Sequence, residues 1–385
     1  GEEDALVHPP SDTFFTLRRS PTTIRNVSNV FAWGQENVDL LRQYPELPAN
    51  MPIHITGNPR GDILRPEMRS YFDTEVERLR NLYGDFILIN TNFTDVNPFI
   101  PNIGLFLPAK GPGGKSRLDQ AGIGMSRQFA EGLWDHKQAI LEDFQQLIPA
   151  LEQAFPDLTI IVRPHPSENF KIYNDLAAKC ERVKVTNEGN VIPWLLAAKT
   201  MVHNGCTTGL EAYVLGVPAI SYLTTFNEYY DYEFQGLPTK LSHQCFSFEQ
   251  LNRTITRILA GELDVAKSEE RKALIDYYLA AQNERLACER IVDVLEESGY
   301  GKRQPPASPI GTYVQGWALT KLKAAVTNLN MRRPGPNRLA YHNHRFPEIS
   351  VAEIEQKVAR FGQLLNRFSA IRVEQHSKHL FRING

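Results

Sequence analysis

Two short stretches of this sequence carry residue types that could bind an anion. His165 stands between two prolines directly after the apolar run 158–162, and Thr207 and Thr208 follow another apolar run that ends at Val202. An imidazole can donate a hydrogen bond to a phosphate or carboxylate oxygen. The free backbone N–H groups at a helix start add neutral donors and a partial positive charge. Together, the two stretches predict a site for a phosphate-bearing ligand.

Each stretch also has an ordinary structural interpretation. A threonine between a strand and a helix commonly caps the helix, and a histidine between prolines can be a rigid corner only. Glu211 could accept from ribose hydroxyls or face solvent, and Arg163 could face a phosphate or pair with Glu168. What favours a site is that both stretches belong to one strand–helix series. The carboxyl ends of parallel strands share one edge of a sheet, where ligands bind.

Alternating strands and helices must position these residues. Long helices are expected at 65–82 and 127–155 and after Gly209, and strands are expected at 85–90, 158–162, 183–186, 200–202 and 219–222. Such an alternation indicates an α/β fold with a doubly wound parallel sheet. Beyond it, we expect helices at 248–259 and 267–298, and after residue 306 only helices, at 313–329 and 351–368.

The beginning of the chain has too few elements for a complete domain. Short strands are expected at 5–8, 29–33 and 52–56, with one helix at 37–44. Three short strands and one helix make too small a layer to stand alone. We therefore expect residues 1–65 to be part of an N-terminal Rossmann-like domain, with further strands outside this sequence. Residues 66–300 would form a second Rossmann-like domain, and residues 301–385 a set of C-terminal helices.

Composition narrows the function classes. The 385 residues carry a net charge of −2, so no general basic field argues for nucleic acid. The four cysteines are widely spaced and match no metal-binding pattern, which predicts reduced thiols in a cytoplasmic protein. No apolar run is long enough to cross a bilayer, so any association with the inner membrane is expected to be peripheral. The glycine-rich segment 110–115 lies between two lysines but matches no P-loop spacing, and we expect a mobile loop over a cleft.

Four segments resemble bacterial surface-carbohydrate biosynthesis proteins. They are Ile-Thr-Gly-Asn-Pro-Arg-Gly-Asp at 55–62, Ile-Leu-Ile-Asn-Thr-Asn-Phe at 87–93, Arg-Pro-His-Pro-Ser-Glu at 163–168 and Asn-Gly-Cys-Thr-Thr-Gly-Leu-Glu-Ala at 204–212. Those proteins are GT-B-type glycosyltransferases similar to the retaining β-Kdo transferases of O-antigen and capsule assembly, which use CMP-Kdo. The resemblance implies two Rossmann-like domains facing each other across a cleft. Residues 1–65 would lie on the acceptor side, 66–300 would hold a CMP-sugar, and 301–385 would pack back on the N-terminal domain.

The resemblance also implies the donor site and the partners. The His-Pro motif of the family matches His165-Pro166, and its Ser/Thr-rich helix start matches Thr207-Thr208. The donor would be a CMP-sugar and the acceptor an oligosaccharide or glycolipid, at the inner face of the cytoplasmic membrane. No cofactor or metal is expected, because the leaving group is a monophosphate and the sequence holds no Asp-x-Asp motif. The expected donor-binding residues are Asn90, Asn92, Arg163, His165, Pro166, Glu168, Asn204, Gly205, Thr207, Thr208, Gly209 and Glu211.

A retaining transfer can run through a covalent sugar adduct on a carboxylate. Asp135, near the start of the helix 127–155, is the first candidate for this nucleophile. Asp95, where the strand 85–90 gives way to a polar loop, is the second, and Glu131 is the third. For Asp135 and Glu131 the alternative is an ordinary acidic residue near a helix start, where the helix dipole favours it.

Other functions remain open from the sequence. A glycerophosphotransferase that uses CDP-glycerol shares a His-Pro corner and a Ser/Thr turn. A non-catalytic carbohydrate-binding scaffold on the same fold would bind a sugar without turning over a nucleotide donor. A nucleotide-sugar epimerase is a further alternative, distinguished because it needs no acceptor.

Overall fold

The computed structural model describes residues 15, 19–100, 103–109, 116–234, 236–299, 309–331, 343, 348–377 and 379–385. The strand expected at 5–8 and the loop expected at 110–115 lie outside these residues. Among the residues described, no helix is both long enough and apolar enough to cross a membrane.

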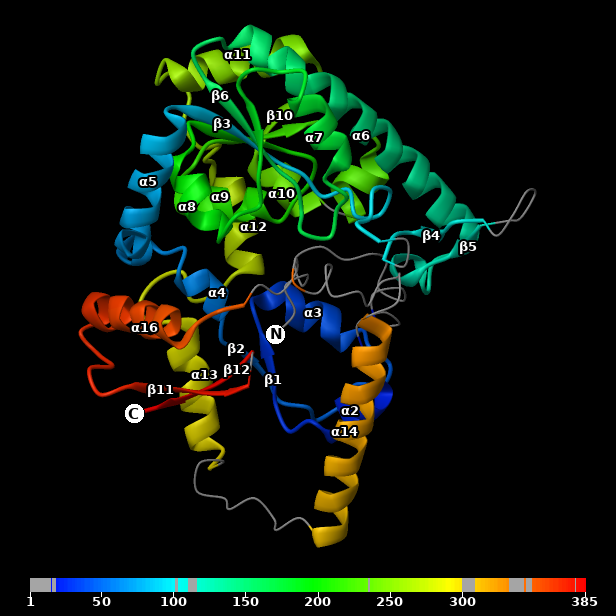
Figure 1. The fold of residues 1–385 in the computed structure, drawn as a ribbon, viewed down its shortest axis with the longest axis vertical. Helices are drawn as coiled ribbons and strands as arrows, with labels where there is room; N and C mark the ends of the chain where they lie inside the picture. The colour runs from blue at the N-terminus through cyan, green and yellow to red at the C-terminus, as the bar shows by residue number, and fades with distance from the viewer. Residues whose placement is uncertain are drawn as a thin grey trace. The chain divides into compact units, whose positions relative to one another are not determined.

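A six-stranded parallel sheet organises the larger part of the chain (Figure 1). Its strand order is β10-β9-β8-β3-β6-β7, so the chain starts near the middle and winds outward in both directions. This confirms the α/β class and the doubly wound parallel sheet. The strands are β3 (Phe86–Asn90), β6 (Thr159–Arg163), β7 (Val183–Val185), β8 (Thr200–His203), β9 (Ala219–Tyr222) and β10 (His243–Cys245).

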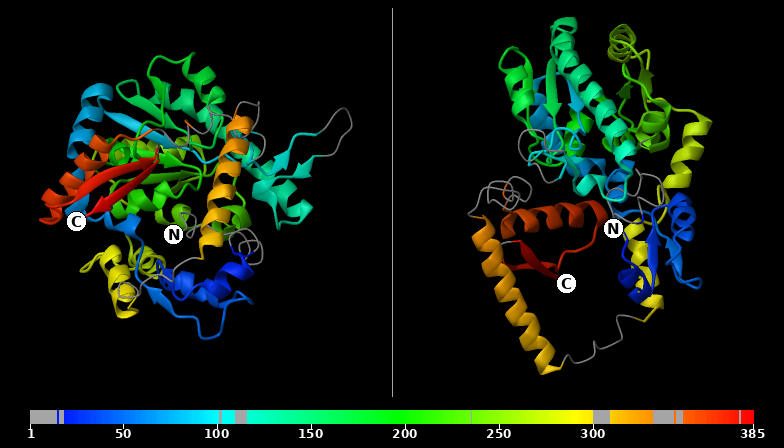
Figure 2. Two further views of the ribbon diagram at one scale, coloured as in Figure 1. Left: turned by 60° about the horizontal axis from the view of Figure 1, so that its bottom comes forward. Right: turned by 90° about the vertical axis from the view of Figure 1, so that its right-hand side faces the viewer.

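Helices cover both faces of this sheet. One face, with Ile87 and Ile89, packs under α6 (Arg127–Ala154), α7 (Lys171–Ala177) and α11 (Phe248–Leu259). The other face, with Phe86 and Leu88, packs under α5 (Asp73–Tyr83), α8 (Val191–Ala197) and α9 (Thr208–Leu215). Successive residues of a strand point to opposite faces. A strand buried on both sides therefore reads as an unbroken apolar run, as β3 does. Figure 2 shows the long helix α6 from the side.

On the sheet face that α9 covers, a row of polar residues lies at the carboxyl ends of four strands. Asn90 pairs in register with Arg163 on one side and His203 on the other, and His203 pairs with Ser221. Register partners in a sheet point to the same face. All four residues are buried. Buried polar groups need hydrogen-bond partners. The row therefore marks the boundary between the apolar core and the edge of the sheet where a ligand can bind.

The N-terminal segment forms a small layer of its own. Strands β1 (Val30–Ala32) and β2 (Ile53–Ile55) make a two-stranded parallel sheet, close to the expected positions. The helix expected at 37–44 is found at Gln35–Arg42 (α3). The other elements are α2 (Pro21–Asn26), α4 (Pro59–Asp62) and the 3-10 helix η1 (Pro66–Phe72).

This layer contacts the segment that follows α12 (Glu269–Tyr278). Ala280 donates its N–H to the Trp33 carbonyl at 2.7 Å. Asp62 accepts from the N–H groups of Ala287 and Cys288, at the start of α13 (Ala287–Glu297). The expectation of one helix over 267–298 is wrong. The chain breaks between α12 and α13, where Ala281 and Glu284 take φ values of 58° and 60° that no right-handed helix accommodates.

The chain divides into two compact units, Gly1–Val294 and Leu295–Gly385. The domain boundaries at 65/66 and 300/301 stay predictions. The second unit holds α14 (Ile310–Met331), α16 (Val351–Leu365) and an antiparallel hairpin of β11 (Arg372–Ser377) and β12 (Leu380–Asn384). The expectation that this end is only helical is therefore wrong. The hairpin buries little except Val373, so its sequence carries no apolar alternation to mark it.

Five short elements complete the described part of the first unit. β4 (Phe106–Leu107) and β5 (Arg117–Leu118) form an antiparallel pair, followed by the 3-10 turn η2 (Gln120–Gly122). A π-helical segment, η3 (Tyr229–Phe234), precedes the short helix α10 (Gly236–Leu241), which packs on α9.

Candidate functional site

A cavity of about 410 Å³ opens at the carboxyl edge of the sheet, on the side of α9. The two stretches that the sequence marks for an anion both line it: His165 with Pro166, and Thr207 with Thr208. The other residues on its wall include Trp33, Asn58, Arg60, Leu64, Asn90, Thr91, Arg163, Asn190, Val191, Cys206, Leu210, Glu211 and Leu279. Of the expected donor-binding residues, Asn92, Glu168, Asn204, Gly205 and Gly209 are not on this wall.

Two glycines determine the shape of the turn between β8 and α9. Gly205 has a φ of +82°, a conformation that favours glycine, and its N–H donates to His203 Nδ1 at 3.0 Å. A side chain at Gly209 would place its Cβ only 2.8 Å from His203 Nε2. The two glycines therefore let α9 start close against the sheet, and they act on the cavity through this packing.

His203 stabilises the turn between β8 and α9 through hydrogen bonds of its ring. Because Nδ1 accepts from Gly205, the ring proton is on Nε2, which donates to Ser242 Oγ at 2.9 Å. The Ser242 hydroxyl donates in turn to the Pro238 carbonyl at 2.8 Å. Complete burial lowers the pKa of His203 to about 3, so the ring is neutral at physiological pH. Nothing in the sequence distinguishes His203 from its neighbours as a structural residue.

The helix start at Thr207 and Thr208 faces the cavity. Thr207 occupies the cap position of α9 but makes no side-chain capping bond, so the ordinary capping interpretation does not hold. The N–H of Gly209 is already bonded to the Cys206 carbonyl at 2.9 Å. A ligand in the cavity would therefore meet Thr207 and Thr208 rather than Gly209, in the partial positive field of the helix start.

The His165 corner is set by the residues that follow it. The backbone N–H of Ser167 donates to His165 Nδ1 at 3.2 Å, and Thr94 Oγ1 lies 3.5 Å from the same nitrogen. With Nδ1 accepting, a neutral ring carries its proton on Nε2 and can donate from there. His165 is exposed at the cavity rim, which suits contact with a ligand.

Glu168 lies beneath this corner, fully buried, and does not reach the cavity. One carboxylate oxygen accepts from Thr91 Oγ1 and from the His165 N–H, both at 2.9 Å. The other accepts from the Tyr173 hydroxyl at 2.6 Å. Burial raises the pKa of Glu168, and these hydrogen bonds lower it in part. The expectation of direct donor contact is not supported, because Glu168 braces the His-Pro corner from inside.

Arg163 lies on the cavity wall but uses its donors on the protein. Its guanidinium donates to the carbonyls of Glu188 and Gly189 at 2.8 and 2.6 Å and lies over the Trp194 ring at 5.4 Å. Burial lowers its pKa to about 10, so it stays charged at neutral pH. The alternative of an ion pair with Glu168 is wrong. Arg163 instead fixes the loop before α8 and adds a positive charge to the wall.

An ion pair joins α9 to the N-terminal segment across the cavity wall. Arg60 Nε and Nη2 each lie 2.7 Å from Glu211 Oε1. Glu211 is 6 % exposed, which rules out the solvent-facing interpretation. Arg60 was not among the expected site residues, although segment 55–62 carries part of the resemblance, and that segment was the available signal.

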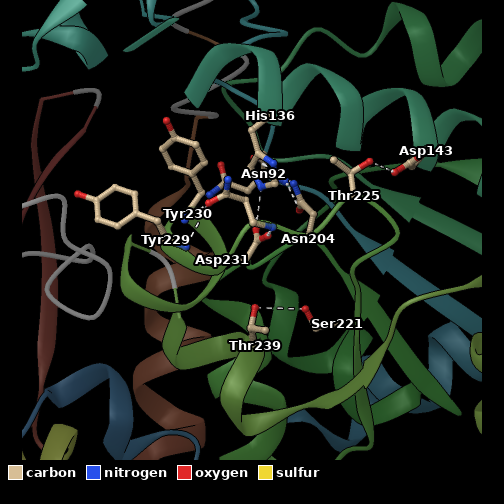
Figure 3. A network of polar contacts seen from close by, with 11 residues as sticks. Asn92, His136, Asp143, Asn204, Ser221, Thr225, Tyr229, Tyr230, Asp231 and Thr239 are labelled. Carbon is tan, nitrogen blue, oxygen red and sulfur yellow. Dashed lines mark hydrogen bonds and ion pairs between the residues drawn. The ribbon is translucent and has the colours of Figure 1, made fainter. Parts of the chain in front are cut away.

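The three asparagines divide into two roles. Asn92 and Asn204 bind each other: Asn204 Oδ1 accepts from the Asn92 N–H at 2.9 Å, and Asn204 Nδ2 donates to the Asn92 carbonyl at 3.3 Å (Figure 3). They fasten the exits of β3 and β8 together. Asn90 instead lies on the cavity wall, with Nδ2 donating to Met201 Sδ at 3.4 Å.

None of the expected nucleophiles lines this cavity. Asp135 and Glu131 lie on a second cavity of about 680 Å³, beside Trp134 and the β4–β5 pair. Glu131 also pairs with Arg127 at 2.8 Å. The start of α6 does lie at the ligand-binding edge, but α6 covers the opposite face of the sheet from α9.

Asp95 is the third expected nucleophile and lies half-buried after β3. Burial raises its pKa, and the charge of Lys137 lowers it in part. Lys137 is itself buried, which lowers its pKa, and the charges of Asp95 and Asp231 raise that pKa in part. Of the three carboxylates, Asp95 is the one that follows β3, the strand whose last residue lines the cavity. Its catalytic role stays a prediction.

A second polar network lies on the α6 side of the same edge (Figure 3). Asp231, on η3, contacts His136 Nε2 at 3.0 Å through one oxygen and accepts from the Asn227 N–H at 2.7 Å through the other. Asn227 Oδ1 accepts from the N–H groups of Tyr229 and Tyr230 at 3.1 and 3.2 Å. The sequence showed only a stretch rich in Tyr, Asn and acidic residues. Among the described residues, no three His, Cys, Asp or Glu side chains are placed to hold a metal ion.

No protein-family model matches the chain, and no curated protein matches it. Among solved structures, a variant of the wall teichoic acid polymerase TagF aligns at 12% identity over 77% of this chain and 66% of that chain, with a TM-score of 0.44. UDP-GlcNAc 2-epimerase from Methanocaldococcus jannaschii, in complex with UDP-GlcNAc and UDP, aligns at 16% identity over 70% and 61%, with a TM-score of 0.37.

The UDP-GlcNAc 2-epimerase from Neisseria meningitidis, bound to UDP-GlcNAc, aligns at 13% identity over 70% of this chain and 61% of that chain, with a TM-score of 0.38. The chain thus spans about three fifths to two thirds of the length of these proteins. At these TM-scores the similarity carries no argument about what this chain binds, and that question rests on the site itself.

Proposed function

We propose that the cavity beside His165 binds the donor of a glycosyltransferase, a sugar activated as its cytidine monophosphate. The chain would transfer Kdo or a related ulosonic acid to a surface-polysaccharide or glycolipid acceptor. The observation that carries the proposal is that His165 and the Thr207-Thr208 helix start line one cavity, although they are about forty residues apart in sequence. The resemblance of four segments to surface-carbohydrate enzymes supplies the donor class.

The electrostatics of the wall suit a phosphate. His165 can donate from Nε2, the start of α9 contributes a partial positive charge, and the Arg163 guanidinium adds a full one. The cavity volume of about 410 Å³ lies within the range of small-molecule sites, roughly 300–1,000 Å³. Apolar side chains such as Leu64 and Val191 line other parts of the wall and could contact a base.

For the chemistry, we propose a two-step transfer with retention. A carboxylate oxygen bonds to the anomeric carbon as the bond to CMP breaks, and the electron pair leaves with the phosphate. An acceptor hydroxyl then displaces the carboxylate and gives up its proton to a base. Asp95 is the first candidate to test, because it follows β3, whose last residue Asn90 lines the cavity. Asp135 and Glu131 belong to the neighbouring cavity and remain the alternatives.

A donor screen tests the proposal. The 385-residue chain is incubated with CMP-Kdo, CDP-glycerol or UDP-GlcNAc, with and without an oligosaccharide acceptor, and nucleotide release is measured. We expect release of CMP from CMP-Kdo, loss of this activity in His165→Ala, and no change in Lys171→Ala, whose side chain is exposed on α7. Turnover of CDP-glycerol alone would favour a glycerophosphotransferase. Binding without any turnover would favour a carbohydrate-binding scaffold.

Mass spectrometry distinguishes the three candidate nucleophiles. Incubation with CMP-Kdo, quenching and proteolysis should reveal a sugar adduct on one acidic side chain. Asp95→Asn, Asp135→Asn and Glu131→Gln are then compared, and full activity in any of them eliminates that residue as the nucleophile.

A further inference from the structure

We infer that Asn90 is a specificity-determining residue of the His165 cavity, and that its side-chain carbonyl accepts a hydrogen bond from a hydroxyl group of the bound molecule. The inference rests on the proposed function, in which a nucleotide-activated sugar occupies this cavity. The hydroxyl belongs to the ribose or to the transferred sugar, and the experiment below distinguishes the two sources.

The first observation is the burial of an acceptor at the cavity. Asn90 ends β3, lines the cavity and is only 3 % exposed. Its Oδ1 has no hydrogen-bond partner in the part of the chain that the structure describes. Buried polar side chains in native proteins nearly always have a partner, so each exception calls for an explanation.

The second observation is the orientation of the amide. Nδ2 lies 3.4 Å from Met201 Sδ. A thioether sulfur can only accept, so the NH₂ group belongs on that side and the carbonyl on the other. The terminal torsion of asparagine is soft, so a small rotation can turn this carbonyl toward a bound group.

The third observation is the contrast with the rest of the polar row. Arg163 donates to two backbone carbonyls, and both ring nitrogens of His203 are bonded. Ser221 Oγ lies 3.2 Å from Thr239 Oγ1 (Figure 3). These neighbours of Asn90 in the register have protein partners that explain their polarity. The Asn90 carbonyl is the member of the row for which the described residues supply no partner, and we assign that partner to the bound molecule.

The chemistry of the carbonyl selects the group that it meets. A carbonyl oxygen can only accept, and so can the oxygens of an ionised phosphate or carboxylate. Such groups would repel one another at this position. A hydroxyl can donate to Asn90 and accept from another group. The phosphate therefore belongs at His165 and Thr207-Thr208, and a hydroxyl-bearing ring belongs at Asn90.

Calorimetric titrations test this with the wild-type chain, Asn90→Ala and the control Asn174→Ala, whose asparagine is exposed on α7. The ligands are CMP, its 2′-deoxy and 3′-deoxy analogues and UMP, and the KM for CMP-Kdo is measured in parallel. If the ribose is the source, the wild type binds CMP about tenfold more tightly than one deoxy analogue. Asn90→Ala loses this preference, and Asn174→Ala keeps it.

If the transferred sugar is the source, CMP and both deoxy analogues bind alike in all three proteins, and Asn90→Ala raises the KM for CMP-Kdo about tenfold. Unchanged affinities and an unchanged KM in Asn90→Ala overturn the inference while CMP binding, and with it the proposed function, stands. An equal loss for every ligand, or a loss of discrimination against UMP alone, also overturns it. Absence of CMP binding by the wild type overturns the proposed function and this inference together.

Discussion

Two polar regions lie at the carboxyl edge of the same sheet and differ in how their polar atoms are used. Around Glu168 and Asp231, every carboxylate oxygen is bonded to protein donors. On the wall of the His165 cavity, the buried Asn90 carbonyl has no partner among the described residues. The bonded carboxylates hold loops in place, whereas the Asn90 carbonyl is left for a ligand.

The same difference predicts what mutations do. A residue whose bonds are all internal should matter for stability, since its loss leaves buried donors unpaired. A residue that lacks a protein partner loses little stability when it is truncated, and its effect should be on binding.

Glu168→Ala should lower the free energy of unfolding by about 3 kcal/mol or more, because three donors, two of them buried, lose their acceptor. Urea denaturation followed by circular dichroism measures the change. A loss below about 1 kcal/mol would show that the His165 corner does not depend on this carboxylate.

The Glu168 carboxyl group should also contribute to the pH dependence of the free energy of unfolding. Burial raises the folded-state pKa of Glu168 above the ordinary value of 4.5, so the protonated form favours folding. Its contribution is fully present below pH 4.5 and is lost as pH rises through the raised value. Glu168→Gln, which cannot ionise, should flatten this part of the profile of unfolding free energy against pH. Identical slopes in the two proteins would contradict the assignment.

His136→Ala should cost about 1–3 kcal/mol, since it leaves one oxygen of the buried Asp231 without its partner. The loop from Asn227 to Tyr230 should loosen with it. Hydrogen exchange at the Asn227, Tyr229 and Tyr230 amides measures this local effect. Unchanged protection of these amides would show that Asp231 holds the loop without His136.

Asn90→Ala should change the free energy of unfolding by less than about 1 kcal/mol, because the side chain donates only to a sulfur atom. The comparison with Glu168→Ala is made in the same urea titration. A loss as large as that of Glu168→Ala would mean that Asn90 belongs with the structural polar groups.

Much of the fold follows from the sequence, because the central strands are buried on both faces and read as apolar runs. β3, β6, β8 and β9 fall where these runs predict them. The hairpin β11–β12 and the π-helical η3 carry no comparable pattern, and the break between α12 and α13 depends on two residues with positive φ.

The location of the site could be predicted from the sequence, but many of the side chains that line it could not. The ends of β6 and β8 predicted where the cavity lies, because parallel strands share an edge. Register and helix packing decide on which face of the sheet a residue at that edge lies. Glu168 and Glu211 are both acidic residues after a strand, yet Glu168 lies inside and Glu211 lines the cavity. Asp135 lines the second cavity for the same reason, since α6 covers the other face.

We propose that His165 and the Thr207-Thr208 helix start hold one phosphate. Isothermal titration of CMP into the wild-type chain, His165→Ala and Lys171→Ala measures the contribution of His165 to this binding. We predict binding by the wild type, affinity about tenfold weaker or worse for His165→Ala, and no change for Lys171→Ala. Absence of CMP binding by the wild type, or equal affinity in His165→Ala, would contradict the account.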